Sequence, residues 1–350
     1  MDLEKKIDLV TRRPTEEVIT RDELRALMQT NEHPRHYQGF EISGRLHLGT
    51  LVLSGYKIND LIEAGVDCTV YLADWHSFIN NKLGGNWDNI ITAAKYFGEG
   101  FKFFCPGVKT VLGSDLYHEN DEYWRDIMRF SRQLTLARNT RCLTIMGRSM
   151  KENLSFAQYL YPPMQAVDVK YLGPDLPHGG MDQRKVHVLC REVYPKLGWK
   201  KPIPLHHHLL MGLEAPDSSI SKRDREIAAK MSKSKPWTCI YVHDDEQAIK
   251  NKINKAYCPE KVSDGNPVLD LAENIVFRKT KELRVTRPSK FGGDVEYASY
   301  GELVKAYTGG ELHPQDLKAA VAVELNKIVA PIREHFEHRK HLMEVFRRAE

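Results

Sequence analysis

The N-terminal half of the chain alternates short apolar runs with longer segments of helical periodicity. The apolar runs have the length of strands and cover residues 37–42, 68–73 and 108–112. Between them, apolar side chains recur at helical spacing over residues 51–62 and 87–104. Strands that alternate with helices predict a parallel sheet covered on both faces. We therefore expect an α/β fold, with ligands bound at the C-terminal ends of the strands.

Other parts of the chain depart from this alternation. Residues 1–34 suggest one or two short helices, at 15–17 and 20–28, before the first strand. The stretch 214–229 is polar and highly charged, which favours a mobile arm, and from residue 244 onward the pattern is mostly helical. The predicted organisation is a lead-in, an α/β domain with a helical insertion, a mobile loop and an all-α C-terminal domain, over residues 1–34, 35–213 (insertion 114–160), 214–243 and 244–350.

Composition narrows the class of protein. The chain has 350 residues, which is enough for two domains and a sizeable core. Its net charge of +4 is only mildly basic, so charge alone says little about RNA binding. Six cysteines are scattered singly, which favours reduced thiols over a disulfide framework or a zinc site. No run approaches 18 apolar residues and no signal-peptide core is present, so we expect a cytoplasmic protein without a membrane segment.

A small-residue turn follows the first predicted strand. Ser43 and Gly44 separate that strand from the helical pattern that begins near Leu51. Backbone N–H groups at a helix N-terminus have no intrahelical partner, so a phosphate can bind there while His47 donates a hydrogen bond to it. The motif His-x-Gly is weak evidence by itself, and a surface histidine beside a glycine turn is the alternative.

A second motif strengthens the first. Residues 230–234 read Lys-Met-Ser-Lys-Ser, in a polar loop after the sheet-like part of the chain. In this pair the chain resembles the class I aminoacyl-tRNA synthetases, whose ATP motifs end His-x-Gly-His and Lys-Met-Ser-Lys-Ser. Thr50 stands where the first motif has its last histidine. The resemblance implies ATP with Mg²⁺ as substrate and assigns catalysis and ATP binding to His47, Gly49, Thr50, Lys230, Ser232, Lys233 and Ser234.

A polar stripe on a predicted helix indicates a pocket. Tyr161, Gln165 and Asp168 lie at positions i, i+4 and i+7, and two prolines after Tyr161 suit a first helical turn. Such side chains do not normally face a core, because burying an unpaired carboxylate or amide is costly. A solvent-facing stripe is the alternative. In a pocket, Asp168 and Tyr37 can accept from and donate to a phenol, while Tyr161, Gln165 and the later Gln183 can accept from an ammonium group.

These residues narrow the resemblance to the archaeal and eukaryotic type of tyrosyl-tRNA synthetase. The family patterns Tyr-x-Gly-Phe-Glu, Tyr-Pro-x-Met-Gln-x-x-Asp and Gly-Gly-x-(Asp/Glu)-Gln-Arg-Lys occur at 37–41, 161–168 and 179–185. The resemblance implies a Rossmann-like catalytic domain, L-tyrosine and tRNA(Tyr) as substrates, and a homodimer. It makes Tyr37 and Asp168 readers of the tyrosine hydroxyl. The residues implied to bind the ammonium group and backbone of tyrosine are Tyr161, Gln165 and Gln183, with Glu41 beside them. The implied ribose contacts are Gly180 and Asp182.

Two alternatives to this function stay open. A tryptophanyl-tRNA synthetase shares the fold and both ATP motifs, although an indole offers only a donor and fits the Tyr37 and Asp168 pair less well. A relative that binds RNA but has lost catalysis is the other alternative, and the intact motif at 230–234 argues against it.

The resemblance also implies contacts with tRNA. Stacking on an unpaired base and reading of a guanine edge are ordinary RNA chemistry, and the matching anticodon residues are Phe291, His313, Pro314 and Asp316. Residues 127–151 hold basic side chains and no acid, which is typical either of a solvated face or of a phosphate-binding surface. For the tRNA acceptor end the candidates are Arg129, Arg132, Arg138 and Arg141.

Three adjacent histidines at 206–208 suggest a metal at first sight. Neighbouring side chains on a strand point to opposite faces, so the three cannot converge on one ion. We therefore expect a strand end near the nucleotide and no protein-bound structural metal.

Overall fold

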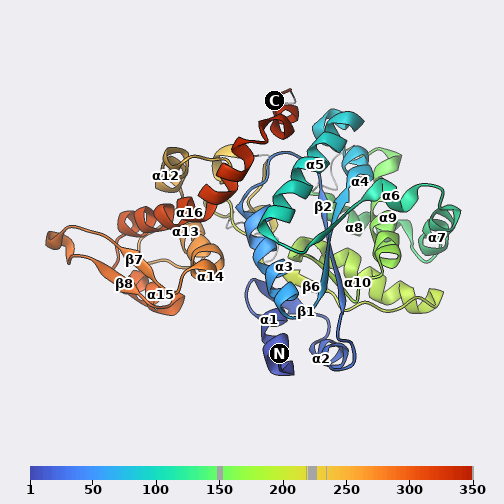
Figure 1. The fold of residues 1–350 in the computed structure, drawn as a ribbon, viewed down its shortest axis with the longest axis horizontal. Helices are drawn as coiled ribbons and strands as arrows, with labels where there is room; N and C mark the ends of the chain where they lie inside the picture. The colour runs from blue at the N-terminus through green and yellow to red at the C-terminus, as the bar shows by residue number, and fades with distance from the viewer. Residues whose placement is uncertain (148–152, 218, 220–226, 234, 349–350) are drawn as a thin grey trace. The chain divides into compact units, whose positions relative to one another are not determined.

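The computed structural model describes residues 1–147, 153–217, 219, 227–233 and 235–348 (Figure 1). The chain forms two compact units, each built from separate stretches of sequence. The first unit contains Met1–Gly44, Lys57–His208 and His341–Glu350, and the second contains Arg45–Tyr56 and Leu209–Lys340. Within the described residues, no helix is long and apolar enough to span a membrane.

The first unit is built on a mainly parallel sheet, as the sequence predicts. Its strands lie in the order β1-β6-β5-β2-β3-β4, and β2, β3, β4, β5 and β6 pair in parallel. The bounds of these five strands are β2 Arg35–Glu41, β3 Asp67–Ala73, β4 Lys109–Leu112, β5 Leu176–Gly180 and β6 Leu205–His207. The α/β fold is confirmed, and the C-terminal ends of β2, β3 and β5 meet at one edge of the sheet.

One N-terminal prediction is wrong. Residues 15–17 form part of strand β1 (Thr15–Val18), which pairs antiparallel with β6, and not a helix. Four residues carry little local preference, so pairing with the free edge of β6 decides their conformation. The other short helix is confirmed as α2 (Arg21–Thr30), which Thr20 and Glu23 begin with a reciprocal capping box. Helix α1 (Leu3–Thr11) precedes both.

Helices of the first unit follow its strands. The pattern at 87–104 is confirmed as α5 (Trp87–Phe104), and the pattern at 51–62 forms a π-helical turn, η1 (Leu48–Leu53), continued by α3 (Ser54–Glu63). The turn η1 belongs to the second unit. The remaining helices of the first unit are α4 Asp74–Ile79, α6 Gly113–Tyr117, α7 Asp121–Ser131, α8 Leu136–Cys142, α9 Phe156–Leu172, α10 Arg184–Val193 and α17 Glu344–Arg348.

Helix α9 differs from its prediction at the two prolines. It begins with a capping box at Ser155, so Pro162 and Pro163 lie in its second turn and not in the first. A proline there leaves a carbonyl one turn earlier without its helical partner. For Pro163 that carbonyl belongs to Tyr159, and the side-chain amide of Asn139 donates to it at 2.7 Å. The neighbouring helix α8 therefore satisfies the backbone that the proline exposes.

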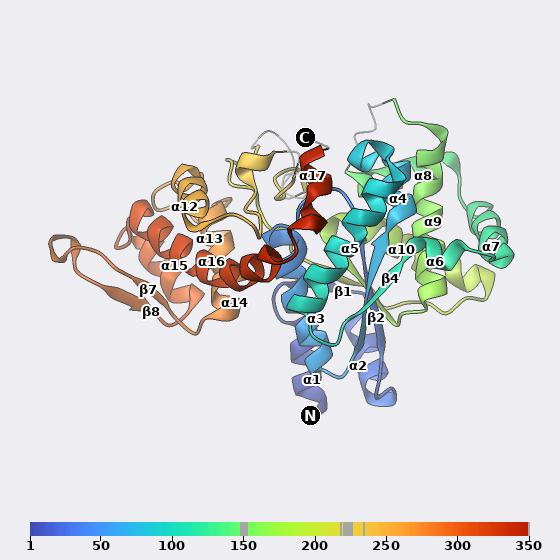
Figure 2. The ribbon, with the colours of Figure 1, turned by 45° about the horizontal axis from the view of Figure 1, so that its top comes forward.

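The second unit is mostly helical, as predicted, with one addition. Strands β7 (Leu283–Val285) and β8 (Val295–Tyr297) form an antiparallel hairpin, visible in Figure 2. Leu283 and Val285 are fully buried on one face, while the arginine between them is exposed, so burial of this alternating pair favours a strand. The helices are α12 Glu246–Lys255, α13 Pro267–Leu271, α14 Phe277–Lys279, α15 Tyr300–Gly309 and α16 Pro314–Glu337.

The functional division of the chain at residues 34, 213 and 243 stays a prediction. The C-terminal residues from His341 belong to the first unit, where Phe346 of α17 contacts the ring of Tyr96 edge-on at 5.1 Å between centroids.

Candidate active site

A buried carboxylate is the centre of the predicted amino-acid pocket. Asp168 of α9 is fully buried and accepts hydrogen bonds from the hydroxyls of three tyrosines. Tyr117 and Tyr123 donate to Oδ1 at 3.0 and 2.7 Å, and Tyr71 donates to Oδ2 at 3.0 Å. Burial raises the pKa of Asp168 to about 7, and the three hydroxyls oppose that rise because they stabilise the ionised form.

The sequence pattern does not identify these three tyrosines as neighbours of Asp168. They come from β3, α6 and α7, which are separate in the chain, so no local spacing connects them with Asp168. One signal was available for Tyr71: it lies near the C-terminal end of a predicted strand of the sheet, where ligands bind in parallel α/β folds.

The other predicted tyrosine-binding residues fall into two bonded pairs in the same unit. The Tyr161 hydroxyl donates to Glu41 at 3.4 Å, and the Gln165 amide donates to Gln183 at 3.1 Å. Tyr161 and Asp168 are both buried, so the solvent-facing stripe is excluded for them. Tyr37 is buried too, and burial followed by the nearby charge of Asp168 raises the pKa of its phenol. Tyr37 therefore stays protonated and able to donate.

His76 adds an unpredicted polar group beside the carboxylate. It lies in α4, is 2% exposed, and its Nε2 atom lies 3.6 Å from Oδ2 of Asp168. Neither ring nitrogen makes a hydrogen bond of ordinary geometry within the described part of the chain. Burial lowers its pKa to about 3, so His76 is neutral at physiological pH. A neutral imidazole can donate from one nitrogen and accept at the other.

The predicted ribose contacts follow β5 in the same unit. Gly180 ends β5, and Asp182 lies in the 3₁₀ turn η4 (Met181–Gln183) that comes next. The charge of Asp182 acts on His207 of β6, raising the pKa of that histidine against the larger lowering caused by burial.

The three adjacent histidines are engaged with other side chains. His178 links His36 to His207, with nitrogen separations of 3.0 and 2.8 Å, and His206 lies 3.0 Å from His187. The other nitrogen of His206 binds Glu17 at 2.9 Å, and His208 binds Glu16 at 2.7 Å. In the described ranges, no three His, Cys, Asp or Glu side chains form a group that could hold a metal ion.

The two predicted ATP motifs both lie in the second unit, and each is bonded to a neighbouring segment. The backbone N–H of Leu48 donates to Ile240 at 3.0 Å, and that of Met231 donates to Leu210 at 2.6 Å. His47 is nearly buried, and burial, followed by the positive charges of Lys233 and Lys230, lowers its pKa. Residues far apart in the sequence thus place one histidine and two lysines in a common electrostatic environment.

Thr50, the departure from the first motif, has a defined role in the structure. Its hydroxyl lies 2.7 Å from Nε2 of His47, so the two side chains hydrogen-bond to each other. Gly49 lies against the same ring, because a Cβ atom there would come within 3.2 Å of the imidazole. Among the motif lysines, Lys230 and Lys233 are half-buried, as is Ser232. Ser234 lies outside the described residues.

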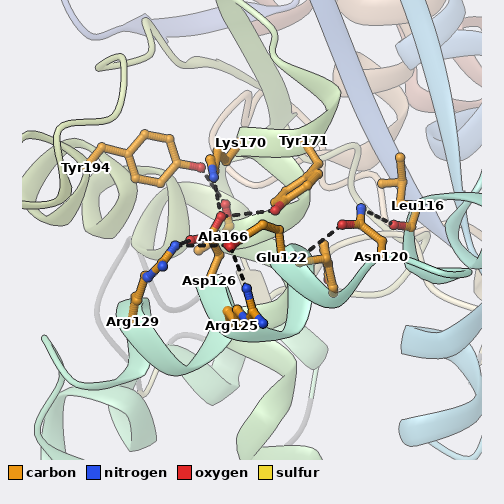
Figure 3. Close-up of polar contacts among 11 residues, drawn as sticks. Leu116, Asn120, Glu122, Arg125, Asp126, Arg129, Ala166, Lys170, Tyr171 and Tyr194 are labelled. Carbon is orange, nitrogen blue, oxygen red and sulfur yellow. Dashed lines mark hydrogen bonds and ion pairs between the residues drawn. The ribbon is translucent and has the colours of Figure 1, made fainter.

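The predicted acceptor-end arginines differ in their surroundings. Arg129 pairs with Asp126 at 3.0 Å and with Glu122 at 3.2 Å, and Figure 3 shows Asp126 between Arg129 and Lys170. Arg138 pairs with Glu192. The side chains of Arg132 and Arg141 are exposed, and a role in phosphate binding stays a prediction for all four arginines.

The predicted anticodon residues lie in the second unit. Phe291 is 60% exposed, an unusual position for a large apolar ring, and Lys290 places its ammonium 4.9 Å from the ring centroid. His313 caps α16 by accepting from the N–H of Gln315 at 3.2 Å, and Pro314 is the first residue of that helix. Asp316 lies in the first turn of the same helix. The cap explains His313 and Pro314 structurally, while the exposed ring of Phe291 has no such explanation.

Comparison with known proteins bears on this arrangement. The family described as tRNA synthetases class I (W and Y) matches residues 28–330. The chain belongs to this family. Among curated class I relatives, a tyrosine–tRNA ligase of Thermococcus sibiricus is 46% identical over 99% of this chain and 98% of its own length. One from Pyrobaculum calidifontis is 45% identical, over 96% and 95%.

Solved structures of class I synthetases agree with the fold. A tyrosyl-tRNA synthetase from Pyrococcus horikoshii, crystallised with L-tyrosine, superposes with a TM-score of 0.93 at 43% identity, covering 99% of this chain and all of the other. A tryptophanyl-tRNA synthetase from Aeropyrum pernix gives a TM-score of 0.73 at 16% identity over 98% of this chain and 90% of its own. The second likeness concerns the fold alone.

Proposed function

We infer that this chain is a tyrosine–tRNA ligase. It activates L-tyrosine with ATP to give tyrosyl-adenylate and pyrophosphate, and then transfers tyrosine to the 3′-terminal adenosine of tRNA(Tyr). The observation that supports this most directly is Asp168, a buried carboxylate held by phenol donors in a chain 43% identical to a synthetase crystallised with L-tyrosine. A carboxylate with an acceptor position left over suits a substrate hydroxyl and does not suit the bare ring of phenylalanine.

In the first step, the tyrosine carboxylate attacks the α-phosphorus of ATP in line, and the bond to the pyrophosphate oxygen breaks. The attacking group is already ionised, so no general base is needed. Catalysis comes from positioning and from stabilising charge on the transferring phosphoryl group. His47 is neutral because its pKa is lowered, and it donates a hydrogen bond to phosphate while Thr50 orients its ring.

Positive charge for the pyrophosphate comes from the second motif. Lys230 and Lys233 bind the leaving group, and Ser232 and Ser234 add hydroxyl contacts. Mg²⁺ that accompanies ATP would neutralise part of the charge on the phosphates. Gly180 and Asp182 bind the ribose.

In the second step, the terminal ribose hydroxyl of tRNA attacks the adenylate carbonyl and AMP leaves. We assign the anticodon to Phe291, His313, Pro314 and Asp316, and the acceptor end to the arginines of 129–141. Tyr37 and Asp168 read the substrate hydroxyl, and the pairs Tyr161–Glu41 and Gln165–Gln183 receive the ammonium group. The reaction takes place in the cytoplasm, where tRNA is charged.

We also propose that the protein is a homodimer. Helices α7, α8 and α9 expose several large apolar side chains, which is unusual for a free surface. Their exposed fractions are 42% for Trp124, 57% for Met128, 72% for Leu136 and 81% for Phe156. Light scattering would give twice the mass of the 40.3 kDa chain, and a monomer at micromolar concentration would contradict the proposal.

Amino-acid-dependent ATP–pyrophosphate exchange tests the activity. The assay compares tyrosine, phenylalanine and tryptophan in parallel with the wild-type protein. Exchange with tyrosine alone is the expected result. Exchange with tryptophan would keep the fold and mechanism but overturn the pocket assignment, and no exchange with any of the three would identify a relative that has lost catalysis.

A further inference from the structure

We propose that Tyr71, Tyr117 and Tyr123 are positioning residues for amino-acid selection. Their hydroxyls hold the carboxylate of Asp168 so that Oδ2, which accepts at most one of these bonds, keeps a position to read the hydroxyl of the bound tyrosine. The proposal rests on the proposed function and adds to it which oxygen reads the substrate and what prepares that oxygen.

The acceptor positions of the carboxylate can be counted. An ionised carboxylate has about four lone-pair sites, two on each oxygen. Tyr117 and Tyr123 donate to Oδ1 and Tyr71 donates to Oδ2, but the hydroxyls of Tyr71 and Tyr117 also hydrogen-bond to each other, so one of these two phenols shares its single proton with the other. Oδ1 therefore accepts at most two bonds from the phenols and Oδ2 at most one, and Nε2 of His76 lies 3.6 Å from Oδ2. Oδ2 keeps an acceptor position for a further hydroxyl.

The three phenols also form a network of their own. The hydroxyls of Tyr71 and Tyr117 lie 2.5 Å apart, and the rings of Tyr117 and Tyr123 lie 4.6 Å apart. All three side chains are almost entirely buried. Neutral donors are suited to this role, because they stabilise an ionised carboxylate in an apolar setting without adding a second charge that would need its own partner.

A second contact holds Tyr123 against Asp168. Three residues after Tyr123 on α7, the buried carboxylate of Asp126 binds Lys170 and Tyr171, which lie two and three residues after Asp168 on α9 (Figure 3). Tyr171 donates at 3.1 Å, and Lys170 makes a short contact with the same oxygen. This clamp fixes α7 to α9 one helical turn from the point where Tyr123 meets Asp168.

Several other titratable groups lie near Asp168, and their protonation states bear on the interpretation of its pH dependence. His76 on α4 is neutral above pH 5, and Tyr37 on β2 and Tyr161 on α9 stay protonated because burial raises the pKa of both. Asp74 on α4 has a pKa raised by burial and accepts from the backbone N–H groups of Trp75 and Ser114. Tyr71 bonds to Asp168 and also lies near the charge of Asp74, so Tyr117 and Tyr123 are the variants that test Asp168.

The proposal predicts a change in pH dependence. Because kcat/KM reports groups of the free enzyme, its acidic limb in the wild type follows the ionisation of Asp168, near pH 7. Removing one phenol donor stabilises the protonated acid relative to the carboxylate, so the limb moves to higher pH. A hydrogen bond to a charged group corresponds to about tenfold, or about one pH unit.

The experiment measures ATP–pyrophosphate exchange between pH 6 and 8.5 for Tyr123→Phe and Tyr117→Phe. We expect kcat/KM for tyrosine to fall about tenfold at pH 6.5, to recover towards wild type at pH 8.5, and the preference for tyrosine over phenylalanine to fall with it at low pH. Tyr194→Phe is the matched control: the nearby charge of Asp168 helps to raise the pKa of this phenol, but its hydroxyl donates to the backbone carbonyl of Ala166 on the same helix and not to the carboxylate. Its profile should match the wild type.

The outcomes separate this proposal from the proposed function. If the wild type shows no tyrosine-dependent exchange, the proposed function fails and this inference fails with it. If the wild type is active but both phenol variants keep its pH profile, or lose activity equally at every pH with a lower melting temperature, the phenols are structural and only this inference is overturned.

Discussion

The proposed amino-acid pocket of the first unit and the proposed ATP motifs of the second are built in opposite ways. In the pocket, side chains hold one another: Asp168 is fully buried and receives hydrogen bonds from three phenols. At the motifs, backbone hydrogen bonds position the residues: the N–H of Leu48 donates to Ile240, and the N–H of Met231 donates to Leu210. The lysine side chains there are only half-buried.

The proposed ligands of the two regions account for this difference. A phenol differs from a benzene ring by one hydroxyl, so selecting it requires a buried acceptor that is costly to leave unpaired. Such an acceptor must be shaped by neighbours before the substrate arrives. ATP carries several negative charges, and half-solvated cations on a defined backbone can bind it without a buried, saturated network. Selection depends on preorganised side chains, and charge stabilisation depends on a positioned loop.

The largest effect should come from removing a positive charge from the ATP motifs. Replacing Lys233 with Ala removes a cation that stabilises the transferring phosphates, so tyrosyl-adenylate formation should slow about 10²–10³-fold. Tyrosine affinity should stay nearly unchanged, because the pocket belongs to the other unit. Single-turnover kinetics would measure the rate and equilibrium dialysis the affinity. Lys235→Ala, which removes an exposed neighbour paired with Glu214, is the control; a large loss of tyrosine binding by Lys233→Ala would contradict the assignment.

Disrupting the pocket should have the second largest effect, and it should impair the use of tyrosine while leaving ATP binding unchanged. In Asp168→Asn the side chain keeps its size but loses its charge, so kcat/KM for tyrosine should fall about 10²-fold at pH 8. Exchange with phenylalanine should change far less, since that substrate makes no bond to the carboxylate. ATP binding, measured by the KM for ATP, should be unaffected. Equal losses with both amino acids would mean that Asp168 supports the fold and not selection.

The stability of the first unit should fall in acid because of its buried histidines. Burial lowers the pKa of His36 to about 3, while the unfolded chain titrates near 6.5. Below pH 6.5 the unfolded state binds the proton more readily, so stability is fully present above pH 6.5 and is lost as pH falls towards 3. Between pH 7.5 and 5, His36 alone should cost about 2 kcal/mol.

Urea denaturation at the two pH values measures this loss. The variant His36→Gln should reduce the difference between pH 7.5 and 5 by about 2 kcal/mol. The matched control, His33→Gln, changes an exposed histidine three residues earlier and should leave the difference as it is. The same slope in wild type and His36→Gln would show that His36 does not carry the acid sensitivity.

The smallest effect should concern tRNA. Replacing the exposed Phe291 with Ala removes a ring that can stack on an unpaired base, so kcat/KM for tRNA(Tyr) should fall about tenfold. Pyrophosphate exchange should be unchanged, because it needs no tRNA. Aminoacylation assays with wild type and variant test this, and a normal kcat/KM for tRNA would remove Phe291 from the anticodon site.

The sequence anticipated the parts of the molecule that depend on local pattern. The β2 strand and helix α5 follow from apolar periodicity, and the turn at Gly44 from its small residues. The helix expected at residues 20–28 corresponds to α2. The strand β1 was not anticipated, because four residues adopt the conformation that the edge of β6 offers. The stripe of Tyr161, Gln165 and Asp168 could be read from one helix.

The partners of Asp168 could not be read in the same way. Tyr71, Tyr117 and Tyr123 reach it from three elements, so their convergence is a property of packing and leaves no spacing in the sequence. The same holds for His36, His178 and His207, which come from three strands and meet because β2, β5 and β6 are neighbours in the sheet. From the sequence alone, only the adjacent histidines at 206–208 could be recognised as a group.

The chain passes between the two compact units after residues 44, 56, 208 and 340. The twelve-residue segment 45–56 therefore belongs structurally with 209–340, to which Leu46 and Leu48 bind through Val242 and Ile240. Recombination between related genes that exchanged only 209–340 would separate His47 from the backbone with which it is matched. We expect functional chimeras to inherit both segments from one parent, so the unit of inheritance is discontinuous in the gene.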